Sequence, residues 1–379
     1  MNFPLDKFKK AETPFYYYDL ALLQRTIDAV KEAARDYRVH YAIKANANPT
    51  ILERMALNGF GADCVSGGEV QAAIDAGIAP EKVVFAGVGK TDSEIALALK
   101  YKIGCFNCES LPELEAIDEI AGKIGHTAHV AIRVNPNIDA HTHHYITTGL
   151  AENKFGISME QLPQVVDAAQ RLKNIEIVGL HFHIGSQILD FEPFEALCNR
   201  INDLQDKYAN ELSLQMINVG GGLGINYNDP DFDSIPDFEQ YFSIFRRNLK
   251  LRTGQSLHFE LGRSIVAQCG TLISRVIYVK EGLRKKFVIV DAGMSELLRP
   301  ALYGAYHQIE NLSAHSDSTP EMTYDVVGPI CESSDVFGNE IKLPLTQRGD
   351  IIAFRSAGAY GETMASNYNL RNLNPPVCS

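Results

Sequence analysis

Short apolar runs alternate with helix-like patterns over the first two-thirds of the chain. Eight of these runs have the length and composition of buried strands, and the segments between them carry apolar residues every three or four positions. Strands separated by helices pair in parallel through right-handed crossovers. A doubly wound open sheet gives a similar rhythm, but eight units in succession favour closure into a (β/α)8 barrel. The eight strands are predicted at residues 39–43, 61–65, 82–86, 103–107, 129–134, 176–183, 214–219 and 257–261.

The rhythm changes after Gly270, where β-rich stretches follow one another without a long helical pattern between them. We therefore predict a second, mostly β domain, with strands at 271–279, 286–290, 324–327, 341–345 and 350–355. The aromatic segment Phe15–Tyr18 is strand-like and precedes the first barrel helix, so it could join this domain and bring the chain ends together. The predicted bounds are 20–268 for the barrel, and 1–19 with 269–379 for the β-rich domain.

The composition excludes several classes of protein. The 379 residues are 45% hydrophobic and 22% charged, which argues against a disordered or collagen-like chain. No run approaches the roughly 18 apolar residues of a membrane helix, and the first ten residues lack the apolar stretch of a secretory signal. The net charge of −12 opposes non-specific binding to nucleic acid or anionic membranes. Together with seven scattered cysteines, which are typical of a reduced thiol set, these features predict a cytoplasmic protein.

Polar and ionisable side chains follow the predicted barrel strands, where barrels of this kind carry their active sites. Lys44 comes directly after the first strand. A lone lysine in this place is usually a surface residue. In a desolvated, cationic setting, however, its amine becomes a Schiff-base nucleophile. The strand-end residues that we single out are Lys44, Asp63, Ser66, Arg133, Asn135, His181, His183, Ser186, Gln187, Glu260 and Arg263, of which the two arginines could supply cationic neighbours for the lysine.

A glycine-rich run at residues 220–224 follows the seventh strand. Its backbone N–H groups could approach an anion closely, although a tight β–α turn would account for the glycines equally well. Barrels often bind phosphate near this position. A Schiff-base lysine with a phosphate site indicates either pyridoxal phosphate or a sugar-phosphate aldolase. Glu260 favours pyridoxal phosphate, because a carboxylate beside the pyridine nitrogen keeps a proton there and makes the ring an electron sink.

Two patterns that could indicate a metal site are interpreted otherwise. Cys105 and Cys108 form an isolated CxxC pair, and no second pair completes a zinc site. The HTHH run at residues 141–144 has only Asp139 as a close acidic neighbour and is interpreted as a loop. Of the two histidines after the sixth strand, His183 could stack on a cofactor ring, whereas His181 fits a hydrogen-bonded histidine of the barrel core.

These residues stand in motifs that resemble the pyridoxal-phosphate decarboxylases of the alanine racemase fold, which include ornithine, arginine and diaminopimelate decarboxylases. The shared motifs cover nearly the whole chain and include YAIKANAN, GADCVSGGE, GLHFHIGSQ, the GGGLG run and ELGR. Three further stretches resemble the diaminopimelate decarboxylase branch, namely DAGMSELLRPALYGAYH, GPICESSD and TTGLAENKFGI. The resemblance implies an enzyme that converts meso-2,6-diaminopimelate to L-lysine and CO2, the last step of lysine biosynthesis.

The resemblance also implies a role for each matching residue. Lys44 would hold pyridoxal phosphate as an internal aldimine, His183 would stack on the ring, and Glu260 would pair with the pyridinium. The other cofactor-binding residues would be Asp63, Ser186, Gly220, Gly221, Gly222, Gly262, Arg263 and Tyr360. The substrate would be held by Arg263, Arg299, Tyr303, Glu332 and Tyr360. Cys331 would be the catalytic proton donor, delivered from the partner subunit of a homodimer with shared active sites.

The implied roles agree with the chemistry of the side chains. An arginine matches the distal carboxylate of diaminopimelate with a fork of N–H donors, and Glu332 suits the distal ammonium. A thiol is mostly protonated at neutral pH, so Cys331 can act as an acid, although most cysteines are small buried hydrophobic residues. Leu261 departs from the family, which usually has proline there, and this departure concerns the local backbone more than the chemistry.

Two alternatives remain beside the decarboxylase. A racemase, or a decarboxylase of another diamino acid, would keep the fold. Racemases of this fold face the pyridine nitrogen with an arginine, however, and ornithine-type substrates would leave Arg299 without a distal carboxylate to bind. A non-catalytic pyridoxal-phosphate carrier is the other alternative. Carriers that consist of the barrel alone lack the C-terminal β domain that is predicted here. Inactive relatives would be expected to lose Lys44 or Cys331, and this sequence has both.

Overall fold

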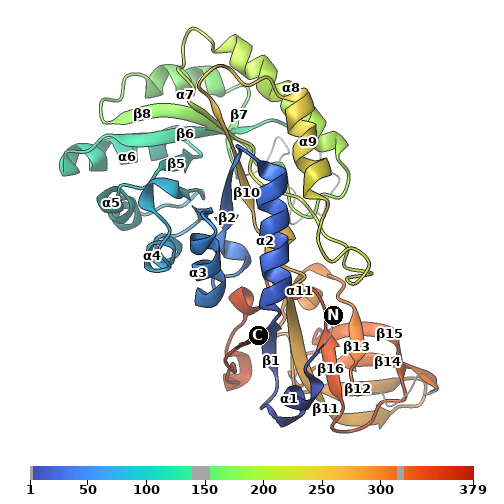
Figure 1. Cartoon of the computed structure of the whole chain (residues 1–379). Helices are drawn as coiled ribbons and strands as arrows, with labels where there is room; N and C mark the ends of the chain where they lie inside the picture. The colour runs from blue at the N-terminus through green and yellow to red at the C-terminus, as the bar shows by residue number, and fades with distance from the viewer. Residues whose placement is uncertain (1–2, 139–153, 314–319) are drawn as a thin grey trace. The chain divides into compact units, whose positions relative to one another are not determined.

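The computed structural model describes residues 3–138, 154–313 and 320–379. The chain divides into two compact units, and Figure 1 shows it from end to end. One unit comprises Ile27–Gly224 and Asp237–Gly262, and the other comprises Met1–Thr26, Ile225–Pro236 and Arg263–Ser379. The sequence placed residues 225–236 inside the barrel domain, whereas this division groups them with the second unit. The predicted domain bounds stay a prediction.

The first unit is built on eight parallel strands that close on themselves. Strand β2 pairs with β3 on one side and with β10 on the other, and the pairing of β5 with β6 completes the ring. The predicted (β/α)8 barrel is therefore confirmed. Its strands are β2 (Arg38–Ala42), β3 (Gly61–Cys64), β4 (Val83–Phe85), β5 (Cys105–Cys108), β6 (Ala128–Asn135), β8 (Ile175–His181), β9 (Met216–Asn218) and β10 (Ser256–Leu261). A two-residue strand, β7 (Ile157–Ser158), extends the sheet beyond β6.

Helices follow the barrel strands, and local signals in the sequence set where they begin and end. In α6, for example, the Ser110 side chain accepts the N–H of Glu113 and caps the N-terminus, while Gly125 ends the helix in the left-handed conformation. The helix buries Leu114, Ile117 and Ala121, which the 3.6-residue period places on one face. The helices are α2 (Leu20–Ala34), α3 (Pro49–Leu57), α4 (Gly67–Asp75), α5 (Asp92–Tyr101), α6 (Leu111–Ile124), α7 (Leu162–Ala169), α8 (Glu192–Lys207) and α9 (Phe238–Asn248), with 3-10 turns η1 (Ile43–Ala45) and η2 (Pro80–Lys82).

The second unit is mostly β, as predicted. Strand β1 (Phe15–Tyr18) has the predicted bounds and pairs antiparallel with β11 (Gly270–Glu281), so the N-terminal segment does join the C-terminal sheet. It also pairs in parallel with β17 (Val377–Cys378), which brings the two ends of the chain together. The remaining strands are β12 (Lys286–Val290), β13 (Ile309–Asn311), β14 (Glu321–Val327), β15 (Val336–Pro344) and β16 (Ile351–Phe354), and the helical segments are α1 (Leu5–Lys10), α10 (Arg263–Val266), α11 (Arg299–Tyr303), η3 (Glu362–Met364) and η4 (Tyr368–Leu370).

Three further points from the sequence can be compared with the structure. Leu261, where the family usually has proline, continues β10 in register with Tyr41 and is buried, so the strand runs on regularly at this position. The histidine run at 141–144 and most of the TTGLAENKFGI stretch lie outside the described residues. Within the described part of the chain, no helix is long and apolar enough to cross a membrane.

Aromatic side chains join α9 to the outer face of the barrel. The Phe259 ring, fully buried on β10, lies with its centroid 4.8 Å from that of Phe242 and 4.9 Å from that of Phe245. Both contacts are edge-to-face, the geometry that aromatic pairs favour. This cluster holds the helix against the strand that carries Glu260.

Replacing Phe259 with alanine should lower the free energy of unfolding by about 3–5 kcal/mol, because a large ring is removed from a closely packed site. Phe232→Ala is the matched control, since Phe232 is 79% exposed, and should change the stability by less than about 0.5 kcal/mol. Chemical denaturation of both variants measures the difference. Equal stability of the two variants would contradict the packing described.

Candidate active site

The amine of Lys44 lies at the carboxyl end of β2 and meets a buried carboxylate. Lys44 is in η1, directly after the strand, and its Nζ donates to Asp63 Oδ2 over 3.0 Å. Burial raises the pKa of Asp63 to about 6, with a contribution from the Glu260 charge and against the opposing effect of Lys44. The lysine side chain is about one-third exposed, whereas Asp63 is fully buried. The carboxylate thus holds an accessible amine at the mouth of the barrel.

Glu260 is held inside the barrel by three side chains from three other strands. Its Oε1 accepts from Asn107 Nδ2 on β5 over 2.9 Å and from Asn218 Nδ2 on β9 over 2.7 Å. Its Oε2 lies 2.9 Å from His181 Nε2 at the end of β8. Burial alone would raise the pKa of Glu260, but His181, together with the Lys44 charge, lowers it below its usual value. The carboxylate is therefore ionised although it is buried.

His183 lies beside the glycine run. The N–H of Gly221 donates to His183 Nδ1 over 3.3 Å. The pKa of His183 is well below its usual value because the ring is buried, and the nearby charges of Lys44 and Arg133 lower it further. The imidazole is thus neutral, and it can lie against a flat ligand without bringing a positive charge to it.

A residue with a side chain would not fit at the glycine positions after β9. A Cβ on Gly221 would lie 2.0 Å from the backbone oxygen of Glu260, and one on Gly220 would lie 2.3 Å from that of Phe182. Gly220 and Gly222 also have φ values of +70° and +111°, a region that other residues rarely adopt. Ile188, in the loop that carries Ser186, donates its N–H to the oxygen of Gly222 over 2.9 Å. The two loops together form a close backbone cradle at the carboxyl ends of β8 and β9.

These features fit pyridoxal phosphate. The cofactor needs an amine for its aldehyde, donors for its phosphate, and a carboxylate for its ring nitrogen. Lys44 supplies the amine and Glu260 the ionised carboxylate. Backbone N–H groups of a glycine cradle are the usual donors to phosphate. The run at 220–222 forms such a cradle, in which the N–H of Gly220 donates to Asn218 Oδ1 and that of Gly221 to His183 Nδ1. At the end of β10, Gly262 lets the backbone pass close to Ala45, since a Cβ at position 262 would lie 2.9 Å from the Cβ of Ala45.

In the second unit, two buried arginines gather around one phenol. Arg263 Nη1 donates to the hydroxyl of Tyr227 over 2.7 Å, and its guanidinium lies 4.8 Å from the centroid of the Tyr360 ring. The Arg299 guanidinium lies 5.0 Å from the Tyr227 ring. Its Nη1 donates to Nε2 of His307 over 2.8 Å. Burial lowers the pKa of His307 to about 3, helped by Arg299, so the imidazole is neutral and accepts this bond. Two guanidiniums in one place suit carboxylate or phosphate groups.

The GPICESSD segment forms a turn that presents Cys331. Asp335 accepts the N–H of Ile330 over 2.7 Å and the N–H of Met294 over 2.6 Å, and so fixes the turn. Cys331 is exposed, unlike most of the other cysteines. The neighbouring Glu332 accepts a hydrogen bond from the Tyr368 hydroxyl. Of the other predicted substrate residues, Tyr303 ends α11, and Tyr360 has a positive φ of +56° in the loop after β16.

The structure gives other partners to some residues that the sequence singled out. Arg133, proposed as a cationic neighbour of Lys44, forms an ion pair with Glu109 at 2.7 Å. His181 is a buried, hydrogen-bonded histidine as predicted, and its partner is Glu260. Cys105 and Cys108 are buried, and no cluster of metal-ligating side chains occurs in the part of the chain that the structure describes.

Four residues that shape these arrangements were missed, namely Asn107, Asn218, Tyr227 and His307. Asn218 lies two residues before the first glycine of the run, and this position was the only signal available for it. Asn107 stands between the two cysteines of the CxxC pattern, and Tyr227 lies in a polar loop. Neither position has a spacing that would distinguish it from ordinary strand or loop residues.

Comparison with known proteins places these arrangements in a family. Residues 20–267 match the family model of the pyridoxal-dependent decarboxylase, pyridoxal binding domain. The chain is 59% identical to the diaminopimelate decarboxylase of Bacteroides thetaiotaomicron over 375 residues, covering 98% of this chain and 96% of the relative. It is 41% identical to the diaminopimelate decarboxylase of Aquifex aeolicus, covering 95% of this chain and 84% of that protein.

A solved structure agrees over the same length. The diaminopimelate decarboxylase of Helicobacter pylori, in complex with L-lysine, superposes with a TM-score of 0.91 at 42% identity, covering 98% of this chain and 93% of that one. Two independent kinds of likeness, in sequence and in structure, therefore extend over both units. The chain belongs to the diaminopimelate decarboxylase family of pyridoxal-dependent decarboxylases.

Proposed function

We propose that this protein decarboxylates meso-2,6-diaminopimelate to L-lysine and CO2 with pyridoxal phosphate as its cofactor, the last step of lysine biosynthesis. The observation that carries the proposal is the buried Glu260 carboxylate, which three side chains hold by hydrogen bonds in the barrel that also carries the Lys44 amine. An acceptor at this place suits a decarboxylase, whereas a racemase of this fold would place an arginine there. Relatives that are 41–59% identical over nearly the full length bear the name of this activity.

When bound, pyridoxal phosphate supplies the electron sink that decarboxylation of an amino acid requires. Lys44 would hold it covalently, and Asp63 would orient the lysine amine. Glu260 would accept a hydrogen bond from the protonated ring nitrogen and so keep the proton on that nitrogen. His183 would lie against the ring as a neutral group. The phosphate would be bound by Ser186, Gly220, Gly221, Gly222, Gly262, Arg263 and Tyr360.

Recognition of the substrate depends on its two ends. Both ends of diaminopimelate carry a carboxylate and an ammonium group. One end must reach Lys44, and the other end must be bound at a distance from the reacting carbon. We assign the distal carboxylate to Arg299, because a guanidinium binds a carboxylate with two parallel hydrogen bonds. Glu332 would bind the distal ammonium. Arg263, Tyr303 and Tyr360 complete the proposed substrate site.

Loss of CO2 leaves a carbon that must be protonated. We assign this step to Cys331, whose exposed thiol could reach a neighbouring chain. The active form would be a homodimer, and each site would use Cys331 of the partner subunit. We further propose a cytoplasmic location, in keeping with seven cysteines that are all free, and a cofactor-binding domain that spans residues 20–268.

Lys44→Ala should abolish both the visible absorbance of the bound cofactor and the release of CO2 from meso-diaminopimelate, because the covalent anchor is lost. Lys123→Ala, which removes an exposed lysine from the barrel surface, is the control and should keep both. The unmodified protein should release CO2 faster from meso-diaminopimelate than from L-ornithine or L-lysine. Comparable rates on these substrates would contradict the assigned substrate, and a coloured, active Lys44→Ala protein would contradict the anchor.

The shared site can be tested by mixing two inactive variants. Cys331→Ala should bind the cofactor but lose about 10²–10⁴-fold in turnover, as expected when a general acid is removed. Cys378→Ala is its control and should be fully active. When Lys44→Ala and Cys331→Ala subunits are exchanged in equal amounts, roughly a quarter of the wild-type activity should return, because half of the dimers then contain one complete site of two. If no activity returns in subunits shown to have exchanged, each site uses its own Cys331.

A further inference from the structure

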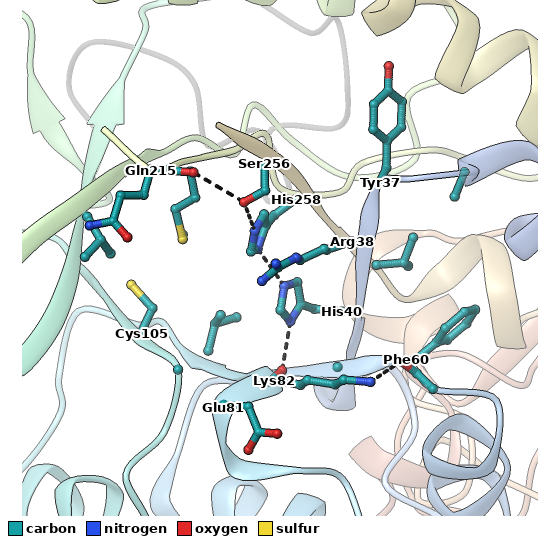
Figure 2. Close-up of a pocket in the computed structure, with 18 of the residues that line it drawn as sticks. Tyr37, Arg38, His40, Phe60, Glu81, Lys82, Cys105, Gln215, Ser256 and His258 are labelled. Carbon is teal, nitrogen blue, oxygen red and sulfur yellow. Dashed lines mark hydrogen bonds between the residues drawn. The ribbon is translucent and has the colours of Figure 1, made fainter. Parts of the chain in front are cut away.

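The barrel has a pocket at the amino-terminal ends of its strands, opposite the end that carries Lys44. It has a volume of about 840 Å³, within the range of sites that bind small molecules. Its lining comes from the residues that begin or precede the strands, such as Arg38 on β2, Gly61 on β3, Lys82 before β4 and Ser256 on β10. Figure 2 shows the side chains of Arg38, Lys82 and Ser256 among those that line the pocket. The whole pocket belongs to the barrel unit.

The pocket extends into the barrel because the side chains there do not fill the interior. Barrels of this type are normally packed with bulky side chains at this level. Gly61 and Gly179 add no side chain at this level, and neighbouring side chains pack directly against them, since a Cβ would lie 2.4 Å from His40 Nδ1 at the first and 2.5 Å from Met216 Cγ at the second. The wall on one side is apolar, formed by Val84, Cys105, Val178 and Met216.

A pair of histidines forms the opposite wall. His40 Nε2 lies 2.9 Å from His258 Nδ1, and the two rings are stacked. The outer nitrogens are bonded as well, since His40 Nδ1 meets the oxygen of Lys82 and His258 Nε2 meets the hydroxyl of Ser256, both at 2.9 Å. Burial lowers the pKa of His40, and lowers that of His258 to about 2. The charge of Arg38 contributes to both shifts. The two imidazoles are therefore neutral, and the positive charge at the pocket comes from its arginine and lysine side chains.

Cationic side chains surround the opening. Lys31, Arg35, Arg38 and Lys82 line it, and Glu81 is the single acidic residue among the lining residues. This excess of positive charge stands in a chain whose net charge is −12. Lys31 and Arg35 lie at the C-terminus of α2, where cations offset the helix dipole without any ligand. Arg38 begins β2, and Lys82 ends the three-residue 3-10 turn η2, so the dipole of α2 does not account for them.

Arg38 lies at the opening of the pocket. Its side chain extends across the opening toward the pocket (Figure 2). No carboxylate among residues 3–138, 154–313 and 320–379 forms an ion pair with it. A guanidinium presents a planar fork of donors that matches the oxygens of a carboxylate or a phosphate. Lys82 Nζ, which donates to the oxygen of Gly59, offers a second positive charge nearby.

We propose that the amino-terminal pocket of the barrel binds a small metabolite that carries an oxyanion group, either a carboxylate or a phosphate. Arg38 and Lys82 hold the oxyanion at the opening, and the body of the ligand lies against the apolar wall. His258 and Glu260 are two residues apart on β10, so this ligand and the catalytic carboxylate lie at successive levels of the same barrel.

Calorimetric titration of the cofactor-loaded protein at constant ionic strength tests the proposal, with inorganic phosphate as one probe and succinate as the other. At least one probe should bind saturably, and the comparison shows which oxyanion the site takes. Arg38→Gln should weaken this binding by about tenfold or more, because a charged hydrogen-bond donor is lost. Arg200→Gln, which removes an exposed arginine from α8, is the matched control and should bind like the unmodified protein. Neither variant should change kcat/KM for diaminopimelate.

Three results would overturn the proposal. They are the absence of saturable binding of either probe, unchanged affinity in Arg38→Gln, and loss of binding when saturating L-lysine occupies the catalytic end. Lys82→Gln serves as a second variant if Arg38→Gln does not fold. The histidine side-chain signals in NMR locate the probe independently. Those of His40 and His258 should shift on titration, whereas a shift confined to His183 would place the probe in the candidate active site and contradict the proposal.

Discussion

A carboxylate kept ionised inside a protein is the interaction on which the proposed chemistry depends. Removing Glu260 from water costs several kcal/mol unless other groups compensate. Asn107, Asn218 and His181 provide that compensation with hydrogen bonds of 2.7–2.9 Å. The three donors come from strands β5, β9 and β8, so only the closed barrel brings them to one carboxylate. The charge state of Glu260 thus depends on closure of the barrel.

Two of the buried carboxylates of the barrel, Glu260 and Asp63, respond differently to burial. Glu260 has three hydrogen-bond partners and a lowered pKa, whereas the pKa of Asp63 is raised to about 6 by burial and by the Glu260 charge. The barrel thus keeps one carboxylate charged, where we propose that it meets the cofactor ring nitrogen. The other lies against the Lys44 amine at 3.0 Å. Such a separation of two acids by their surroundings is a common basis for assigning them different roles.

Much of the fold could be predicted because its signals are local. The eight barrel strands, the β-rich second unit and the strand Phe15–Tyr18 follow from apolar periodicity. Strands β13 and β17, with three and two residues, are too short to show a period. The candidate site could be predicted only in part. Lys44, Glu260 and the glycine run were found from their places at strand ends, but the bond between Asn107 and Glu260 joins residues 153 positions apart. No local pattern reports such a contact, and the same holds for the pocket around Arg38.

The protonation state of the cofactor ring tests this account most directly. The protein can be loaded with pyridoxal phosphate labelled with 15N in the ring, and the nitrogen chemical shift then distinguishes pyridine from pyridinium. Beside an ionised Glu260, the nitrogen should be protonated at neutral pH, and Glu260→Gln should abolish this state. A neutral pyridine in the unmodified protein, with decarboxylation intact, would contradict the role given to Glu260.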